Sequence, residues 1–253
     1  MSTPSWPGLY QIPSRIAHRG GGKLAPENTL AAIRAGMAHG YRAVEFDVML
    51  TVDDVPVLMH DPDFGRTITG RGSVATTTWD DLSRRDAGVW FSPQSAGERV
   101  PRYEDVVCFC REHGVWMNVE IKPAPGHEAR TGRLVGEMTG RLFADQSAGA
   151  AWPLFSSFSV EALEHARSAA PHVPRGLLFD AVPETGIDTA RSLGCVSVHA
   201  SHRQLDRQII VRLHEAGFAV LAYTVNAPSR VAALVDAGLD AIVTDRIDLI
   251  APG

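Results

Sequence analysis

Charged residues stand at the ends of two apolar, strand-like runs of this sequence. In "VEFDV", Glu45 and Asp47 are two residues apart, so both side chains point to the same side of a strand. "VEIK" repeats this spacing with Glu120 and Lys122. Three inward carboxylates would repel one another strongly if they were dry and unpaired, and a divalent cation removes that cost. Ligation by oxygen alone favours a hard ion, Ca²⁺, Mg²⁺ or Mn²⁺, over zinc. The alternative is that the carboxylates only pair with Arg19 and Lys122.

Two histidines stand at comparable positions. His18 ends the run "SRIAH", and His60 ends "VPVLMH". The second of these runs is separated from "FDVML" by only four residues, which is too few for a helical crossover between parallel strands. We therefore expect an antiparallel hairpin that returns His60 to the side of Asp47. One histidine at a strand end is more often structural, but two imidazoles beside three acids suit general acid and general base catalysis near neutral pH.

The charges of this group indicate the kind of substrate. Three carboxylates, one dication and the two cations Arg19 and Lys122 together leave a single positive charge, which favours a monoanion. A phosphodiester is a monoanion whose cleavage needs two proton transfers, one for each histidine. Without the metal ion the group would carry a net negative charge and would repel an anion.

Five times along the chain, a helical pattern is followed by glycine and then by a dense apolar run, as in "EAGFAVLAYTV". Glycine there is typical of a left-handed helix cap, and continuous apolar runs are typical of parallel strands buried on both faces. Eight candidate strands, each followed by a helix-compatible segment, cover residues 14–18, 43–48, 115–121, 153–158, 175–179, 195–199, 218–225 and 240–245. This pattern predicts an α/β fold, the TIM (β/α)8 barrel, with functional side chains at the carboxyl ends of the strands. An open doubly wound sheet is the alternative.

Other polar residues stand at the ends of the remaining strands, and the sequence assigns no role to them: Ser156, Asp180, His199, Thr224, Asn226 and Asp245. Residues 61–102 interrupt the β/α rhythm and are rich in Thr, Gly, Arg and Asp. Loops of such length usually have a function, so we interpret them as an insertion subdomain on the active face, within a single domain of residues 1–253. Trp90 and Phe91 of the insertion either cover part of the substrate or form a small local core.

The glycines of "GGGKLA" allow two interpretations. The stretch loosely matches a dinucleotide-binding fingerprint, with Ala25 at the third position and Glu45 about 20 residues further on, so an NAD(P)-binding oxidoreductase is the alternative function. Against it, His18 and Arg19 stand where the fingerprint needs a tight bare turn, and Pro26 opens the helix four residues after the last glycine. The three glycines are better explained as a flexible approach to phosphate oxygens, or as a plain turn.

Composition excludes several classes of protein. The formal net charge is −5, and no basic stretch could hold a nucleic acid. No apolar run approaches the ~18–20 residues that span a bilayer, and the first fifteen residues lack the basic start and apolar core of a secretory signal. Cys108, Cys110 and Cys195 form no disulfide framework, which fits a reducing compartment. We therefore expect a cytoplasmic enzyme that acts on a small molecule without stable membrane association; the sequence leaves a homo-oligomer open.

Several motifs, in this order, resemble one known family. They are "AHRGGGKLAPENT", "EFDVMLTVDDVPVLMHD", the "RT…G" stretch with "DAGVWF", "VEIKP", "YTVN" and "DAIVTD". Together they resemble the bacterial glycerophosphodiester phosphodiesterases, the cytosolic enzyme most closely, over nearly the whole chain. The resemblance implies a TIM barrel with a small insertion subdomain. It also implies hydrolysis of glycerophosphodiesters, such as glycerophosphocholine or glycerophosphoethanolamine, to sn-glycerol 3-phosphate and an alcohol.

The same resemblance implies roles for the motif residues. It assigns acid–base catalysis to His18 and His60, phosphate contact to Arg19 and Lys122, and ligation of Ca²⁺ or Mg²⁺ to Glu45, Asp47 and Glu120. Glu27 and Asn28 of "PENT" brace the loop, or simply mark a helix N-terminus. The first nucleophile is either water or the glycerol 2-hydroxyl group.

Overall fold

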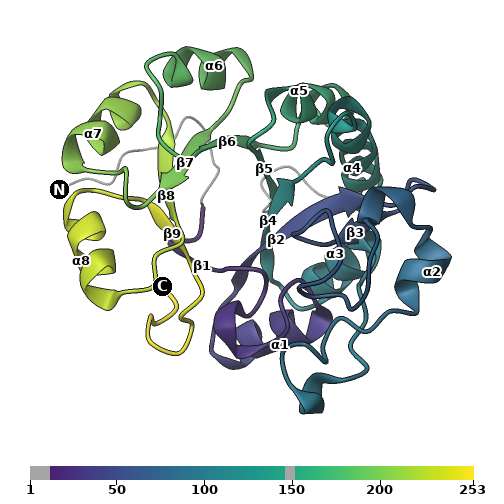
Figure 1. Ribbon diagram of the computed structural model, residues 1–253. Coiled ribbons are helices and arrows are strands. Elements are labelled where there is room, and N and C mark those ends of the chain that lie inside the picture. Colours follow the sequence, from purple (N-terminus) through teal and green to yellow (C-terminus); the bar gives the residue numbers. More distant parts are fainter. Residues whose placement is uncertain (1–11, 146–151) are drawn as a thin grey trace.

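The computed structural model describes residues 12–145 and 152–253. In these residues one sheet of nine strands closes on itself, because β1 (Arg15–Ala17) pairs with both β9 (Ala241–Thr244) and β2 (Ala43–Leu50). The other parallel strands are β4 (Trp116–Ile121), β5 (Leu154–Ser157), β6 (Arg175–Phe179), β7 (Ser197–Ser201) and β8 (Ala219–Tyr223). Helices surround these strands on the outside (Figure 1). The closed parallel barrel confirms the prediction of a TIM barrel and excludes the open doubly wound sheet.

Helices return the chain from each parallel strand to the start of the next. They are α1 (Leu30–Ala38), α3 (Tyr103–Glu112), α4 (Glu128–Leu142), α5 (Val160–Ala169), α6 (Gly186–Ser192), α7 (Arg207–Glu215) and α8 (Pro228–Asp236). Side-chain oxygens of Thr29, Ser159 and Asp206 accept hydrogen bonds from the first turns of α1, α5 and α7, which favours helix starts there. The five glycines predicted as caps all have positive φ: Gly40, Gly114, Gly194, Gly217 and Gly238. The last strand differs from the expected pattern, since residues 245–253, which follow β9, contain turns but no helix.

Alternate residues of the strands face two separate cores. Residues that face outward, such as Phe46 and Val119, pack against the helices. Residues that face inward, such as Ile16, Trp116 and Leu154, pack together inside the barrel. This inner cluster comes mainly from the first residues of the strands, so it fills the amino-terminal end of the barrel and leaves the carboxyl end for polar side chains.

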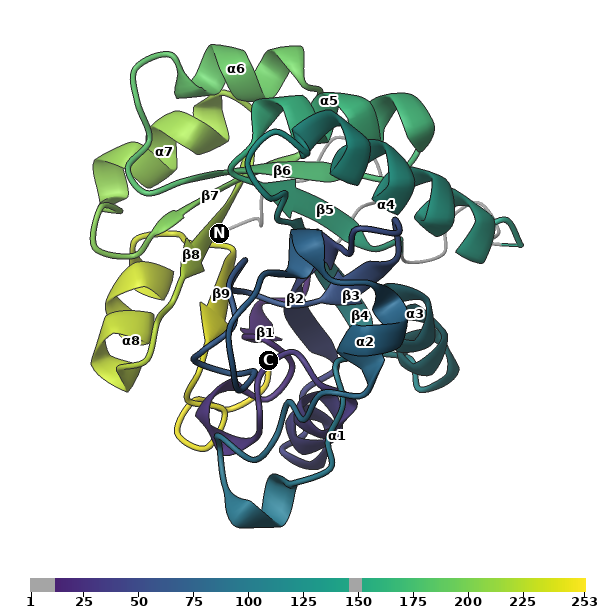
Figure 2. The ribbon, with the colours of Figure 1, turned by 45° about the vertical axis from the view of Figure 1, so that its right-hand side comes forward.

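The predicted hairpin is present, because β3 (Pro56–Leu58) pairs antiparallel with the end of β2. Residues 61–102 follow it and include η2 (Val74–Thr76), α2 (Trp79–Ser83) and η3 (Pro93–Ser95). Ile68 and Leu82 of this segment pack with Met49 and Val57 of the hairpin in a cluster distinct from the two cores of the barrel. In both ribbon views α2 lies beside β3 and α3 (Figure 2).

Among the described residues, none of the helices combines the length and the apolar composition needed to cross a bilayer. Most of the segment in which we expect no secretory signal, residues 1–11, lies outside the described residues. That expectation therefore stays a prediction.

Candidate active site

Three carboxylates meet at the carboxyl ends of β2 and β4. Asp47 lies opposite Glu120 in the parallel register of the two strands, and Glu45 precedes Asp47 on the same side. One oxygen of each lies within 4.8 Å of the others. Glu45 and Asp47 are almost fully buried, with 4% and 1% of their surface exposed. The structure thus brings together the three residues that the sequence predicts as metal ligands.

Burial and mutual repulsion raise the pKa values of these carboxylates, whereas nearby cations lower them, so the three groups shift in different directions. Burial, together with the charges of Asp47 and Glu120, holds the pKa of Glu45 well above its ordinary value. Burial and the charge of Asp47 raise the pKa of Glu120 to about 8. Burial would also raise the pKa of Asp47, but Lys122 and other nearby cations outweigh it, and that pKa is lowered. Lys122 Nζ lies 3.2 Å from Asp47 Oδ1.

The donor set fits a hard divalent cation. Oε2 of Glu45 accepts a hydrogen bond from the backbone N–H of Arg19, at 3.0 Å. Oε1 of Glu45 is buried and has no hydrogen-bond partner among the described residues. A buried carboxylate oxygen without a partner is costly, and a cation bound by the three carboxylates would satisfy it. Glu45, Asp47 and Glu120 are the residues that could hold such an ion.

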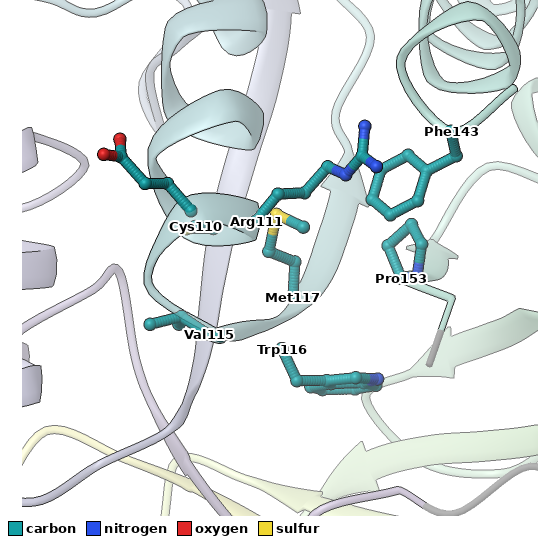
Figure 3. Close-up of a pocket in the computed structure, with 9 residues that line it drawn as sticks. Cys110, Arg111, Val115, Trp116, Met117, Phe143 and Pro153 are labelled. Carbon is teal, nitrogen blue, oxygen red and sulfur yellow. The ribbon is translucent and has the colours of Figure 1, made fainter. Parts of the chain in front are cut away.

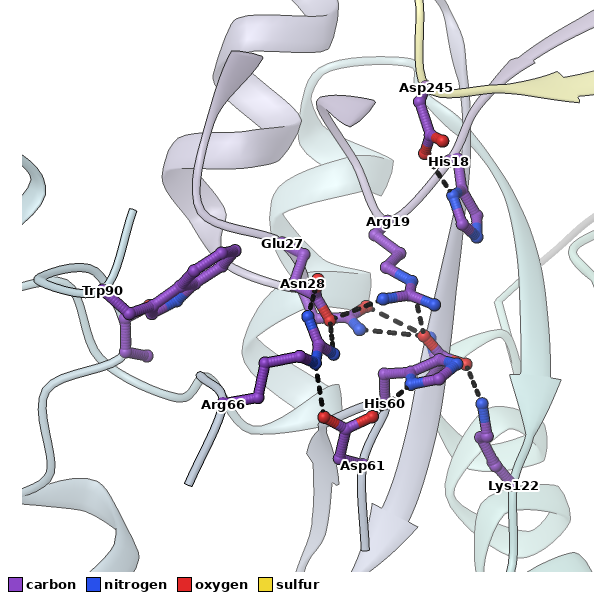
Figure 4. Close-up of polar contacts among 12 residues, drawn as sticks. His18, Arg19, Glu27, Asn28, His60, Asp61, Arg66, Trp90, Lys122 and Asp245 are labelled. Atoms are coloured by element: carbon purple, nitrogen blue, oxygen red, sulfur yellow. Dashed lines mark hydrogen bonds and ion pairs between the residues drawn. The ribbon is translucent and has the colours of Figure 1, made fainter. Parts of the chain in front are cut away.

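Each predicted catalytic histidine is bonded to a carboxylate through Nδ1. His18 Nδ1 lies 2.5 Å from Asp245 Oδ1, and His60 Nδ1 lies 2.6 Å from Asp61 Oδ1. Nε2 of His18 is 3.8 Å from Glu45 Oε2, which places His18 beside the carboxylate trio. Burial lowers the pKa of His60. Figure 4 shows both histidines with their carboxylate partners.

The loop after β1 braces Arg19 and Asp47. Asn28 donates from Nδ2 to Asp47 Oδ2 at 2.8 Å, and Asn28 Oδ1 accepts from the backbone N–H of Asp47 at 3.2 Å. Glu27 accepts from Arg19 Nη1 at 2.7 Å, and it also accepts two hydrogen bonds from Arg66 of the insertion. Arg66 Nε in turn donates to Asp61 at 2.6 Å, as the dashed lines in Figure 4 indicate. Glu27 and Asn28 thus bond directly to Arg19 and Asp47. The bracing role that the family resemblance implies for them stays a prediction.

A cavity of about 270 Å³ lies at the mouth of the barrel. Its charged side is formed by His18, Arg19, Glu45, Asp47, His60, Glu120 and Lys122. Its opposite side is mostly apolar and aromatic, and Phe158 and Tyr223 meet there edge to face with ring centroids 6.0 Å apart. Trp90 and Phe91 are not part of the lining, and Trp90 Nε1 donates to the Ala87 carbonyl within the insertion instead.

A second cavity, of about 510 Å³, opens at the other end of β4 and is lined by different types of side chain (Figure 3). It is lined by Cys110, Trp116, Met117 and Phe143, among others. Arg111, the cation at its edge, is bonded to the Leu142 carbonyl and to Asp145. No carboxylate trio or histidine pair lines this larger cavity, so its size alone does not make it the active site.

Sequence reasoning missed several residues of the site. Asp61 directly follows His60 in the sequence, and this adjacency could have indicated that the two side chains form a pair. Asp245 was recognised only as a polar residue at a strand end, because its partner His18 is 227 positions away. Arg66 lies in the irregular insertion, where no periodicity indicates the direction of a side chain.

Gly20 and Gly21 lie in a turn, which agrees with the plain-turn interpretation of the glycine loop. The approach of these glycines to phosphate oxygens stays a prediction. A Cβ atom at Gly21 would meet the Ala32 carbonyl oxygen at 2.6 Å, and one at Gly22 would meet the backbone of Asp245. The close approach that these glycines permit is therefore to the chain's own backbone. Glu45, the acidic residue of the supposed dinucleotide fingerprint, belongs to the carboxylate trio instead.

Residues 18–249 match the Glycerophosphoryl diester phosphodiesterase family. The chain belongs to this family. It is 30% identical over 234 residues to the glycerophosphodiester phosphodiesterase of Caldanaerobacter subterraneus subsp. tengcongensis, covering 91% of this chain and 93% of that protein. Family membership confirms the predicted enzyme class, a phosphoric diester hydrolase, and gives no support to the oxidoreductase alternative.

Solved structures of related phosphodiesterases share the fold. A phosphodiesterase of Oleispira antarctica, solved in complex with the product sn-glycerol-3-phosphate, is 33% identical, with a TM-score of 0.87 and coverage of 94% of this chain and 95% of that one. The glycerophosphodiester phosphodiesterase of Agrobacterium tumefaciens is 25% identical, with a TM-score of 0.76 and coverage of 94% and 98%. The family's barrel therefore extends over nearly all of this chain.

Proposed function

We propose that this phosphodiesterase hydrolyses glycerophosphodiesters, such as glycerophosphocholine and glycerophosphoethanolamine, to sn-glycerol 3-phosphate and an alcohol. In this proposal His18 and His60 transfer the protons. Glu45, Asp47 and Glu120 hold a divalent cation, Ca²⁺ or Mg²⁺, with Mn²⁺ a further candidate. The product complex of the Oleispira antarctica relative supports the choice of substrate class.

One observation carries the proposal: both histidines are bonded at Nδ1 to a carboxylate, and both line the cavity that holds the carboxylate trio. A carboxylate at Nδ1 keeps the proton there and leaves Nε2 to exchange a proton with the substrate, as in other acid–base dyads. Two such groups match the two proton transfers of diester cleavage.

The remaining charged residues bind the phosphate. Arg19 and Lys122 line the cavity beside the trio and contribute positive charge for the non-bridging oxygens. When bound, the cation supplies Lewis-acid stabilisation of the charge that develops on the phosphoryl group. One histidine takes a proton from the nucleophile, which is water or the glycerol 2-hydroxyl group. The other gives a proton to the leaving oxygen, and attack by the 2-hydroxyl would require a second step in which water opens the cyclic diester.

Release of sn-glycerol 3-phosphate from glycerophosphocholine, followed with and without EDTA, tests the proposal. We expect activity to disappear in EDTA and to return with added Mg²⁺ or Ca²⁺. His18→Ala and His60→Ala should each lower kcat by about 10²–10⁴-fold while KM changes little. His214→Ala is a matched control, because His214 also pairs with a carboxylate, Asp240, but does not line the cavity. Activity that persists in EDTA would remove the metal from the scheme, and a near-normal rate in either variant would remove that histidine.

The insertion also belongs to this proposal. We propose that residues 61–102 form a subdomain on the active face, within the single domain of residues 1–253. Its cluster around Ile68 and Leu82 supports a local core. Arg66, which bonds to both Glu27 and Asp61, supports a connection between this core and the catalytic loops.

A further inference from the structure

Asp245 and Asn226 follow the ends of β9 and β8. The scheme above uses Asp245 only as the Nδ1 partner of His18, and it gives Asn226 no role. Asp245 Oδ1 lies 2.5 Å from His18 Nδ1. The two residues face each other where the barrel closes, because Ala17 and Thr244, which precede them, are partners in the parallel pairing of β1 and β9. Burial works against ionisation of Asp245, but the hydrogen bond and charge of His18 hold its pKa at about 2.

Asn226 fixes the orientation of this carboxylate. Its Oδ1 accepts from the backbone N–H of Asp245 at 2.8 Å, and its Nδ2 donates to Asp245 Oδ2 at 2.8 Å. Because a backbone N–H can only donate, the amide oxygen must face it, and the amide nitrogen must therefore face the carboxylate. Both oxygens of Asp245 thus act as acceptors, one from Asn226 and one from His18.

The backbone around this pair is equally constrained. The N–H of His18 donates to the Thr244 carbonyl at 3.0 Å, and the N–H of Lys23 donates to the Asp245 carbonyl at 2.9 Å. The second histidine is held differently, since Asp61 is shared between His60 and the cation of Arg66. Among the described residues, no lysine or arginine forms an ion pair with Asp245, so its charge is directed at His18.

We propose that Asp245 and Asn226 are positioning residues for catalysis, which hold His18 in the tautomer with its proton on Nδ1 and its Nε2 lone pair facing the cavity. This inference rests on the proposed function, in which His18 transfers a proton. Asp245 accepts the Nδ1 hydrogen, and Asn226 prevents the carboxylate from rotating away. Neither residue needs to touch the substrate for this role.

The variant Asp245→Asn tests the inference sharply. The Nδ2 group of Asn226 requires an acceptor, so the introduced amide must turn its oxygen toward Asn226 and its nitrogen toward His18. Nδ1 of His18 then becomes an acceptor, and the ring proton moves to Nε2. We expect kcat to fall by about 10²–10⁴-fold with KM within about threefold, as for the equivalent change in a serine-protease triad.

Nitrogen-15 NMR of the Mg²⁺-loaded enzyme provides a readout that a purely structural role would not change. Long-range proton–nitrogen correlations distinguish protonated from unprotonated ring nitrogens, and the signals of His18 are those missing from His18→Gln. We expect a protonated Nδ1 in the wild type and a protonated Nε2 in Asp245→Asn. Asp240→Asn is the matched control, because Asp240 pairs with His214 at 2.7 Å away from the cavity; its kcat and the His18 signals should stay unchanged.

Three outcomes separate this inference from the proposed function. If His18→Ala is inactive while Asp245→Asn keeps kcat within threefold or keeps the Nδ1 tautomer, the positioning role is wrong and the proposed function stands. If His18→Ala is itself active, the proposed role of His18 in proton transfer fails, and the inference that rests on it fails too. If Asp245→Asn does not fold, Asn226→Ala decides, because it frees the carboxylate without adding a donor. We then expect kcat to fall about tenfold with both His18 tautomers present, and an unchanged kcat and tautomer would overturn the inference.

Discussion

Gly22 offers a quantitative test of how the glycine loop supports the active site. Its φ is +56°, and a Cβ atom added there would fall well inside the contact distance of the Asp245 backbone carbonyl. Gly114, between α3 and β4, has φ +63° and nothing within 4 Å of the same position. The two glycines therefore share a left-handed backbone and differ in whether the chain approaches closely. Gly22→Ala and Gly114→Ala form a matched pair.

The expected magnitudes follow from these contacts. The left-handed conformation costs alanine about 1–2 kcal/mol, and both variants carry this cost. Gly22→Ala must also displace the carbonyl of Asp245, and such overpacking costs about 1–3 kcal/mol. The displacement weakens the 2.9 Å hydrogen bond from Lys23 N–H to that carbonyl, which contributes about 1 kcal/mol. We therefore expect Gly22→Ala to be less stable than Gly114→Ala by about 2–4 kcal/mol, or by about 4–16 °C in Tm.

Urea unfolding followed by circular dichroism gives the two free energies of unfolding, and the release of sn-glycerol 3-phosphate gives kcat. Gly22→Ala should also lower kcat about tenfold or more, because the displaced backbone carries Asp245 away from His18. Gly114→Ala should keep the wild-type kcat. Equal losses of stability in the two variants would refute the reasoning, since they would mean that the contact of Gly22 with the Asp245 carbonyl has no energetic consequence.

Further predictions concern the metal, a buried histidine and the insertion. Mg²⁺ or Ca²⁺ at a hundred times its Kd should stabilise chelator-treated enzyme by about 2.7 kcal/mol, or about 5–11 °C in a thermal-shift assay. Glu45→Gln should lose most of that shift, and an undiminished shift would place the ion elsewhere. Burial lowers the pKa of His199 to about 3, so only the unfolded chain takes up its proton as the pH falls below about 6.5. This uptake lowers the free energy of unfolding of the wild type by about 2 kcal/mol at pH 5. His199→Gln lacks the titrating group, so between pH 7.5 and pH 5 its free energy of unfolding should fall by about 2 kcal/mol less than that of the wild type. Arg66→Ala, which frees two carboxylates beside the catalytic residues, should lower kcat about 10–100-fold while stability changes by less than about 1 kcal/mol, since Arg66 is 43% exposed. Arg84→Ala is the control, because it removes an ion pair in which 69% of the arginine side chain is exposed. Equal kcat values for Arg66→Ala and Arg84→Ala would argue against a role for Arg66.

Local sequence patterns were sufficient to predict the barrel and the clustering of the three carboxylates. Strands buried on both faces are apolar throughout, and a glycine after each helix marks where the next strand begins, so the eight strands could be counted from the chain. On a strand, residues two apart share a side, which already placed Glu45 with Asp47 and Glu120 with Lys122. The short link before β3 could only be a hairpin, and it brought His60 to the same end of the barrel. These inferences depend on neighbours in sequence, where backbone geometry leaves few alternatives.

Contacts between distant segments required the tertiary structure. The sequence alone determined which strands carry the acids and histidines, but only closure of the barrel between β1 and β9 brought Asp245 to His18 across 227 residues. Arg66 joins Glu27 and Asp61 from an irregular segment, where side-chain direction follows no period. The close contact of Gly22 could not be predicted for the same reason, because the backbone that it approaches is that of Asp245, after the last strand. Periodicity determines the face on which a side chain lies, whereas the partner that it meets depends on strand register and packing, and these are set by the whole chain at once.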